Sequence, residues 1–156
     1  MKNRQALARW VLAALRRAGW APAGLFGFYL IASLVFNAYP LYWWLDSATH
    51  FSGGAALSYF LLDLFDSADD VIGHIPRPIR MTLVFSCVGL AAICWEFYEF
   101  LSDYFFGTTM QWGLADTMSD LFFGLLGSAA FLVQQRLRGV FSRFGKRADA
   151  SKREAR

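Results

Sequence analysis

The sequence predicts an all-α integral membrane protein, a bundle of four transmembrane helices preceded by an amphipathic interfacial helix. Hydrophobic residues make up 56% of the 156 residues and aromatic residues 18%, a more apolar composition than ordinary soluble domains have. Four apolar windows approach the roughly 20 residues that a bilayer-spanning helix needs. They cover residues 22–41, 47–65, 81–105 and 113–135.

The placement of the basic residues supports the same fold class. Of the 15 Lys and Arg residues, five precede the first window, two lie between the second and third, and eight follow the fourth. The other two connections contain none. Because Lys and Arg concentrate in cytoplasmic loops, we expect a multi-pass protein of a bacterial-type inner membrane, with both termini in the cytoplasm.

Three parts of the chain follow from these patterns: an amphipathic basic helix over residues 1–20, a four-helix transmembrane domain over 21–135 and a basic cytoplasmic tail over 136–156. We expect the first helix to lie on the anionic inner leaflet; a plain charged flank that sets orientation is the alternative. The partner we expect is the lipid bilayer, with a homo-oligomer or another membrane protein as further candidates, and no nucleic acid.

Small residues predict where the helices approach one another. Gly53 and Gly54 lie in the second window, and Gly124 and Gly127 lie in the fourth. Small side chains allow close contact between membrane helices. Cys87 and Cys94 stand seven residues apart with no C-x-x-C spacing, so we interpret them as packing residues.

Acidic residues stand inside or at the outer ends of these apolar windows. Glu96, Glu99 and Asp103 fall within roughly 60° of one another on a helix. Asp116 and Asp120 share a second helical face, and Asp46 and His50 a third. The predicted topology delivers all seven to the same leaflet half. Because an ionisable side chain in a bilayer is costly, such a cluster predicts a functional site.

Three interpretations of the cluster stay open. A divalent cation, Mg²⁺, Mn²⁺, Ca²⁺ or Zn²⁺, suits oxygen ligands with one imidazole. A network of protonated carboxyl groups would also relieve the repulsion. Separate roles are the third interpretation, since Asp46 and Asp116 can cap helices and Asp103 can lie among headgroups. Glu96 and Glu99 have no such explanation, because they are mid-helix without a nearby Lys or Arg.

These residues also resemble a family. The patterns Asp46-x3-His50, Trp95-Glu96-x2-Glu99-x3-Asp103 and Gln111-x-Gly113-x2-Asp116-Thr117-x2-Asp120 resemble the YjdF-like inner-membrane proteins of uncharacterised function. The chain is similar, more loosely, to the VanZ-like membrane proteins. The resemblance covers roughly residues 42–130. It implies a shared polar site and supplies no reaction.

Three functions compete. The first is metal-assisted hydrolysis or transfer on a lipid-linked or periplasmic substrate. For it we predict His50, Glu96, Asp116 and Asp120 as metal ligands and Glu99 as the catalytic base, with Asp46, Asp103 and Gln111 as further members of the cluster. The second is transport of protons or a cation, and the third is a polar-cored scaffold that binds a partner membrane protein. Sequence patterns of rhomboid and H-E-x-x-H proteases are absent, and the sequence leaves open whether the protein is an enzyme.

Overall fold

The computed structural model describes residues 2–154, and side chains for residues 5–69 and 71–139. Within these residues every regular element is helical. The elements are, in order, α1 (Lys2–Ala18), α2 (Trp20–Leu30), the π-helical turn η1 (Ile31–Val35), α3 (Leu45–Asp66), α4 (Asp69–Ile72), α5 (Arg77–Phe106) and α6 (Leu114–Glu154). The all-α prediction is therefore confirmed.

Within the described residues, two helices, or three if a bent pair counts as one span, are candidates for crossing a membrane by length and composition. Helices α5 and α6 (over Leu114–Gly139) are long and apolar enough to cross a bilayer, and α1 with α2 and η1 qualifies only as a span bent by 62°. Helix α3 has 22 residues but does not meet this test, because polar side chains interrupt its apolar sequence. The prediction of four transmembrane helices is thus not confirmed.

The first predicted span ends early. The helical path stops at Val35, and Asn37 adopts a positive φ of 44°, a left-handed conformation that asparagine tolerates better than most residues. Pro40 then lies in the irregular connection to α3. Residues 36–41, predicted as the end of a span, therefore belong to a loop.

Helices α3 and α6 form the most extensive contact in the molecule. A Cβ atom added to Gly54 would collide with the backbone of Gly124, and one added to Gly127 would collide with the backbone of Phe51. Nearby, the Ser58 hydroxyl donates to the Ser128 hydroxyl at 2.7 Å, with both side chains fully buried. The close approach predicted from small residues is confirmed here. It fixes the middle of α3 against residues 124–128 of α6.

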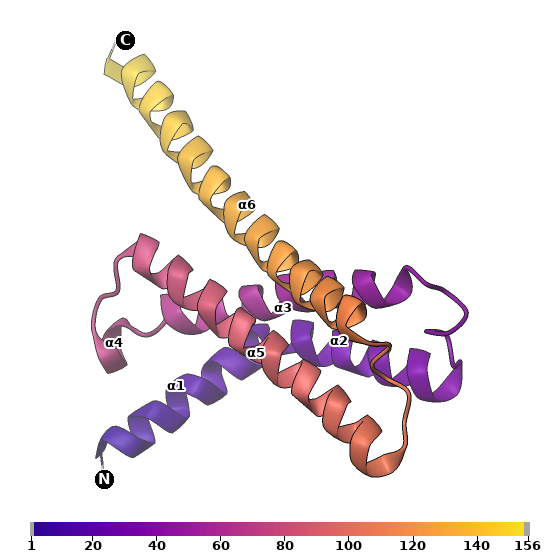
Figure 1. Ribbon diagram of the computed structural model, residues 1–156. Helices are drawn as coiled ribbons and strands as arrows, with labels where there is room; N and C mark the ends of the chain where they lie inside the picture. Colours follow the sequence, from indigo (N-terminus) through magenta and orange to yellow (C-terminus); the bar gives the residue numbers. More distant parts are fainter. Residues whose placement is uncertain (1, 155–156) are drawn as a thin grey trace.

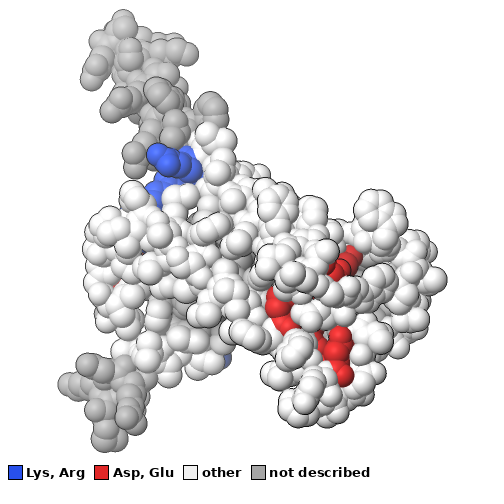
Figure 2. Space-filling model, viewed as in Figure 1, with Lys and Arg blue, Asp and Glu red and all other residues white. Residues whose placement is uncertain are grey.

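The arrangement separates two ends of the molecule. In Figure 1 the start of α1, helix α4 and the far end of α6 lie on one side, and the α5–α6 connection lies on the other. The described Asp and Glu side chains visible in Figure 2 gather toward the α5–α6 connection, and Lys and Arg toward the opposite end. Helix α6 continues as a helix through residues 136–154, which we predicted as a separate tail.

Candidate functional site

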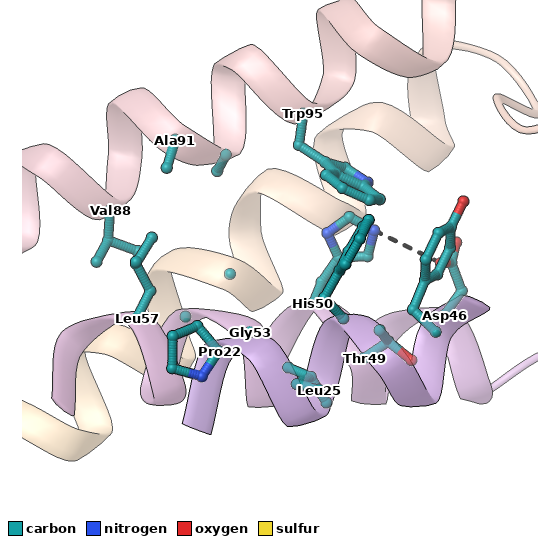
Figure 3. Close-up of a pocket in the computed structure, with 15 residues that line it drawn as sticks. Pro22, Leu25, Asp46, Thr49, His50, Gly53, Leu57, Val88, Ala91 and Trp95 are labelled. Atoms are coloured by element: carbon teal, nitrogen blue, oxygen red, sulfur yellow. Dashed lines mark ion pairs between the residues drawn. The ribbon is translucent and has the colours of Figure 1, made fainter. Parts of the chain in front are cut away.

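The first turns of α3 supply an acid and an imidazole. Asp46 and His50 lie on successive turns, and His50 Nε2 is 3.5 Å from Asp46 Oδ1. Figure 3 shows this pair at one end of a cavity, with Trp95 of α5 nearby. The preceding loop is tied to α3 by a hydrogen bond between Tyr39 and Thr49 (3.1 Å). The i, i+4 pairing expected from the sequence is present.

Helix α6 brings Asp120 to the same place. Its Oδ1 atom lies 3.8 Å from His50 Nε2, and the side chain is 2% exposed. The second oxygen, Oδ2, is buried and has no hydrogen-bond partner. The glycine contacts between α3 and α6 make this approach possible, because bulkier residues there would push the helices apart.

Helix α5 contributes two buried glutamates. Glu96 is 7% exposed and Glu99 5% exposed. The Trp95 indole N–H donates to Glu99 Oε1 at 2.8 Å. Both carboxylate oxygens of Glu96, in contrast, are buried and make no hydrogen bond of ordinary geometry, although the Thr117 hydroxyl and the Gln111 amide lie near the carboxylate. A buried polar group left without a partner costs free energy on the order of 1–3 kcal/mol, and more when it is charged.

The acidic cluster, as we use the term from here, consists of Asp46, His50, Glu96, Glu99 and Asp120. It contains two groups whose ligand atoms all lie within 4.8 Å of one another, namely Asp46, His50 and Asp120, and Glu96, Glu99 and Asp120. Asp120 belongs to both. Among the described side chains, the ion pairs of the cluster involve only His50 as the basic partner.

Three other predicted members serve the α5–α6 connection instead. Asp103 accepts hydrogen bonds from the Thr108 hydroxyl and from the backbone N–H groups of Met110 and Gln111, at 2.6, 2.8 and 2.9 Å. Asp116 accepts from the Trp112 N–H at 2.9 Å. The Gln111 amide donates to the Thr117 hydroxyl at 2.8 Å.

The predicted metal ligands therefore divide. His50, Glu96 and Asp120 lie in the two groups, whereas Asp116 lies in neither. Asp46 and Glu99, which we assigned other roles, lie in one group each. Sequence reasoning also missed the hydrogen bond from Trp95 to Glu99; their i, i+4 spacing on one helix was the available signal.

Two cavities adjoin the acidic cluster. A narrow one, of about 210 Å³, has Asp46 and His50 in its wall and is otherwise lined mainly by apolar side chains, among them Leu25, Leu57 and Val88. A broad one, of about 1430 Å³, includes Asp46, Glu99 and Asp116 in its lining together with several aromatic rings. Asp46 lines both cavities, so each of them adjoins the cluster.

Comparison with known proteins gives the family. Residues 18–138 match the family described as "Predicted membrane protein (DUF2238)". The chain belongs to this family. The match covers all five residues of the acidic cluster and supports apolar, membrane-associated helices. The match does not confirm the YjdF-like name, and the similarity to VanZ-like proteins stays a prediction.

One curated relative is an uncharacterized protein of Thermotoga maritima. It is 29% identical over 108 residues, which are 67% of this chain and 55% of the relative. The chain thus spans about half the length of that relative. No solved structure matches the chain. The family description therefore supports a membrane protein and names no reaction.

Proposed function

We propose that this DUF2238 protein holds a divalent metal ion in the acidic cluster and uses it for hydrolysis or group transfer on a lipid-linked or periplasmic substrate. The proposal places the protein in the inner membrane with both termini in the cytoplasm. The segregation of Lys and Arg in the sequence supports that topology. The acidic cluster then lies in the outer half of the membrane.

The pair of unpartnered oxygens on Glu96 carries the proposal. A carboxylate with no hydrogen bond and no Lys or Arg partner is costly to bury, because water no longer stabilises its charge. Asp120 adds a third unpartnered oxygen a short distance away. Structural roles account for Asp103 and Asp116, whose oxygens accept backbone N–H groups. A cation accounts for Glu96 and Asp120.

The donor set favours a hard or borderline divalent ion. Carboxylate oxygens with one imidazole suit Mg²⁺, Mn²⁺, Ca²⁺ or Zn²⁺. We propose that the ligand atoms come from Asp46, His50 and Asp120 in one group and from Glu96 and Asp120 in the other, and we assign Asp116 to the α5–α6 connection. A bound ion of this kind lowers the pKa of a ligated water and polarises a carbonyl or phosphoryl oxygen.

Glu99 is the proposed general base. Its Oε1 atom accepts the Trp95 N–H, which fixes the orientation of the carboxylate. The residue lines the broad cavity and lies in one group with Glu96 and Asp120. A base must stand within hydrogen-bond reach of the proton that it takes. Glu99 thus lines this cavity and lies in the same group as Glu96, whose two oxygens are unpartnered.

The narrow cavity favours a substrate with an apolar part. It runs from Asp46 and His50 along residues such as Leu25, Leu57 and Val88. An acyl or isoprenoid chain suits such a lining, and the adjoining polar head would then stand at the acidic cluster. The sequence provides no Lys or Arg between Arg80 and Arg136, which favours a head group that needs no cationic clamp.

The test compares three purified full-length proteins: wild type, Glu96→Gln and Asp116→Asn. Glutamine keeps the volume of Glu96 and removes its charge, so metal content by elemental analysis should fall. Asp116→Asn is the matched control at the same end. Its amide oxygen still accepts the Trp112 N–H, and metal content should stay at the wild-type level. Equal metal content in Glu96→Gln and wild type would refute the assignment. Metal uptake into proteoliposomes would make the ion a cargo and favour the transport function.

A further inference from the structure

We propose that the acidic cluster is built for two divalent ions, with Asp120 as the carboxylate that bridges them. This inference rests on the proposed metal function and adds the number of ions and the division of the ligands. Its starting point is that the cluster is not one ring of ligands. It consists of two groups of three that meet at a single residue.

The two groups come from different helices. The first ion would be held by Asp46 and His50 of α3, and the second by Glu96 of α5, with Glu99 in the same group as Glu96. Asp120 of α6 belongs to both groups. Its Oδ1 atom faces His50 at 3.8 Å, while Oδ2 is buried with no hydrogen-bond partner. Because Asp120 offers a ligand atom to each group, its carboxylate can ligate an ion in either one.

Charge balance favours two ions over one. The cluster contains four carboxylates, those of Asp46, Glu96, Glu99 and Asp120, and one imidazole. When ionised, the carboxylates carry four negative charges, so one divalent ion leaves two negative charges uncompensated and two ions leave none. The ion pairs of these acids provide no Lys or Arg among the described side chains. Uncompensated buried charge is strongly unfavourable in an apolar setting, so a second cation stabilises the ionised cluster.

The unpartnered atoms are distributed as two sites require. Glu96 is more than nine-tenths buried and neither oxygen has a partner. It lies in the group that lacks His50. A single ion at Asp46 and His50 would leave Glu96 unsatisfied, and a single ion at Glu96 would leave His50 and Asp46 with only each other and Asp120. Paired ions bridged by a carboxylate are an arrangement used by hydrolases to hold attacking and leaving oxygens together.

The experiment counts ions in the full chain. Wild-type protein in detergent is stripped with chelator, loaded with Mn²⁺, desalted and measured by elemental analysis. We expect two Mn²⁺ per chain in wild type, one in His50→Gln, one in Glu96→Gln, and a loss of both in Asp120→Asn. Asp63→Asn, at the other end of the molecule and paired with Arg17, is the control and should keep two.

Electron paramagnetic resonance of the loaded wild type gives an independent measurement. Two ions bridged by Asp120 should show a spin-coupled spectrum, and a lone ion should not. One Mn²⁺ per chain with an uncoupled spectrum would overturn this inference and leave the proposed metal function standing. No bound ion in wild type would overturn both. Because the wild-type count and spectrum decide the matter, a variant that fails to fold does not weaken the test.

Discussion

The two ends of the molecule contain the same kinds of acidic side chain in opposite circumstances. At the end near α4, Asp63 pairs with Arg17 at 2.8 Å, and Asp66 and Asp69 pair with Arg80. These aspartates are 30–55% exposed. At the other end, Glu96, Glu99 and Asp120 are at most 7% exposed and have no Lys or Arg partner.

The difference teaches what the buried cluster needs. At the arginine-paired end the chain supplies its own cations, and partly exposed ion pairs of that kind contribute little stability, about 0–1 kcal/mol. At the acidic cluster the described side chains provide four carboxylates and no Lys or Arg partner. If the carboxylates of the cluster are ionised, the compensating charge has to come from outside the chain, which is why we propose that the cluster binds a cation and that the arginine-paired acids are structural.

The largest expected effect concerns the sides of the membrane on which the two ends lie. A reporter that is active only outside the cytoplasm should work when fused near Gly107 and fail when fused after Arg156, because Lys and Arg are retained on the cytoplasmic side. An in-frame fusion after Ile75, in the connection that precedes Arg77 and Arg80 at the start of α5, is the matched control and should also fail. Activity after Arg156 with silence at Gly107 would reverse the orientation and place the acidic cluster in the inner half.

A smaller effect is expected from the helix contact that holds the cluster together. Gly54→Ala should destabilise the protein by about 1–3 kcal/mol, because its Cβ would collide with the backbone of Gly124. The change should also separate His50 from Asp120 and lower metal content. Thermal unfolding in detergent, with metal analysis of the same sample, provides both measurements.

The neighbouring glycine provides the control for that experiment. A Cβ on Gly53 would meet only the Leu25 side chain, at an ordinary 3.6 Å. Gly53→Ala should therefore leave unfolding temperature and metal content close to the wild-type values. Equal destabilisation by the two substitutions would contradict the role of the α3–α6 contact, because alanine has the higher helix propensity and should not by itself destabilise α3.

The smallest effect is expected at the arginine-paired end. Replacing Asp63, Asp66 and Asp69 by asparagine, together with Asp70, whose side chain lies outside the described residues, should leave metal content unchanged. Asp63→Asn alone should cost less than about 1 kcal/mol, because the pair with Arg17 is partly exposed. A loss of metal in the fourfold variant would mean that the two groups of acids are not independent.

Sequence patterns predicted the helices with the strongest periodicity and missed the position of one break. The predicted windows 47–65 and 81–105 lie inside α3 and α5. The end of the window 22–41 was wrongly predicted as helix. A hydropathy average over many residues does not register single residues such as Asn37 and Pro40, which favour a non-helical backbone there. The prediction of four spans is not confirmed, because polar side chains interrupt the apolar sequence of α3.

The site was predictable in its helical pairs and less so in its final membership. Spacing placed Asp46 with His50 and Glu96 with Glu99, because a helix fixes which residues share a face. Spacing also placed Asp103 beside Glu99, but the backbone N–H groups of Met110 and Gln111 bind Asp103 in the α5–α6 connection. The conformation of the α5–α6 connection thus determines whether Asp103 joins the acidic cluster, and helical periodicity does not predict that conformation.

The most direct test of the metal hypothesis is the metal content and thermal stability of the wild-type protein. Protein purified in detergent should contain a divalent ion or bind one on incubation with Mg²⁺, Mn²⁺, Ca²⁺ or Zn²⁺. Because a bound ion stabilises the folded state, chelator should lower the unfolding temperature and restored metal should raise it again. Wild type that binds none of the four ions, with an unfolding temperature indifferent to chelator, would contradict the account.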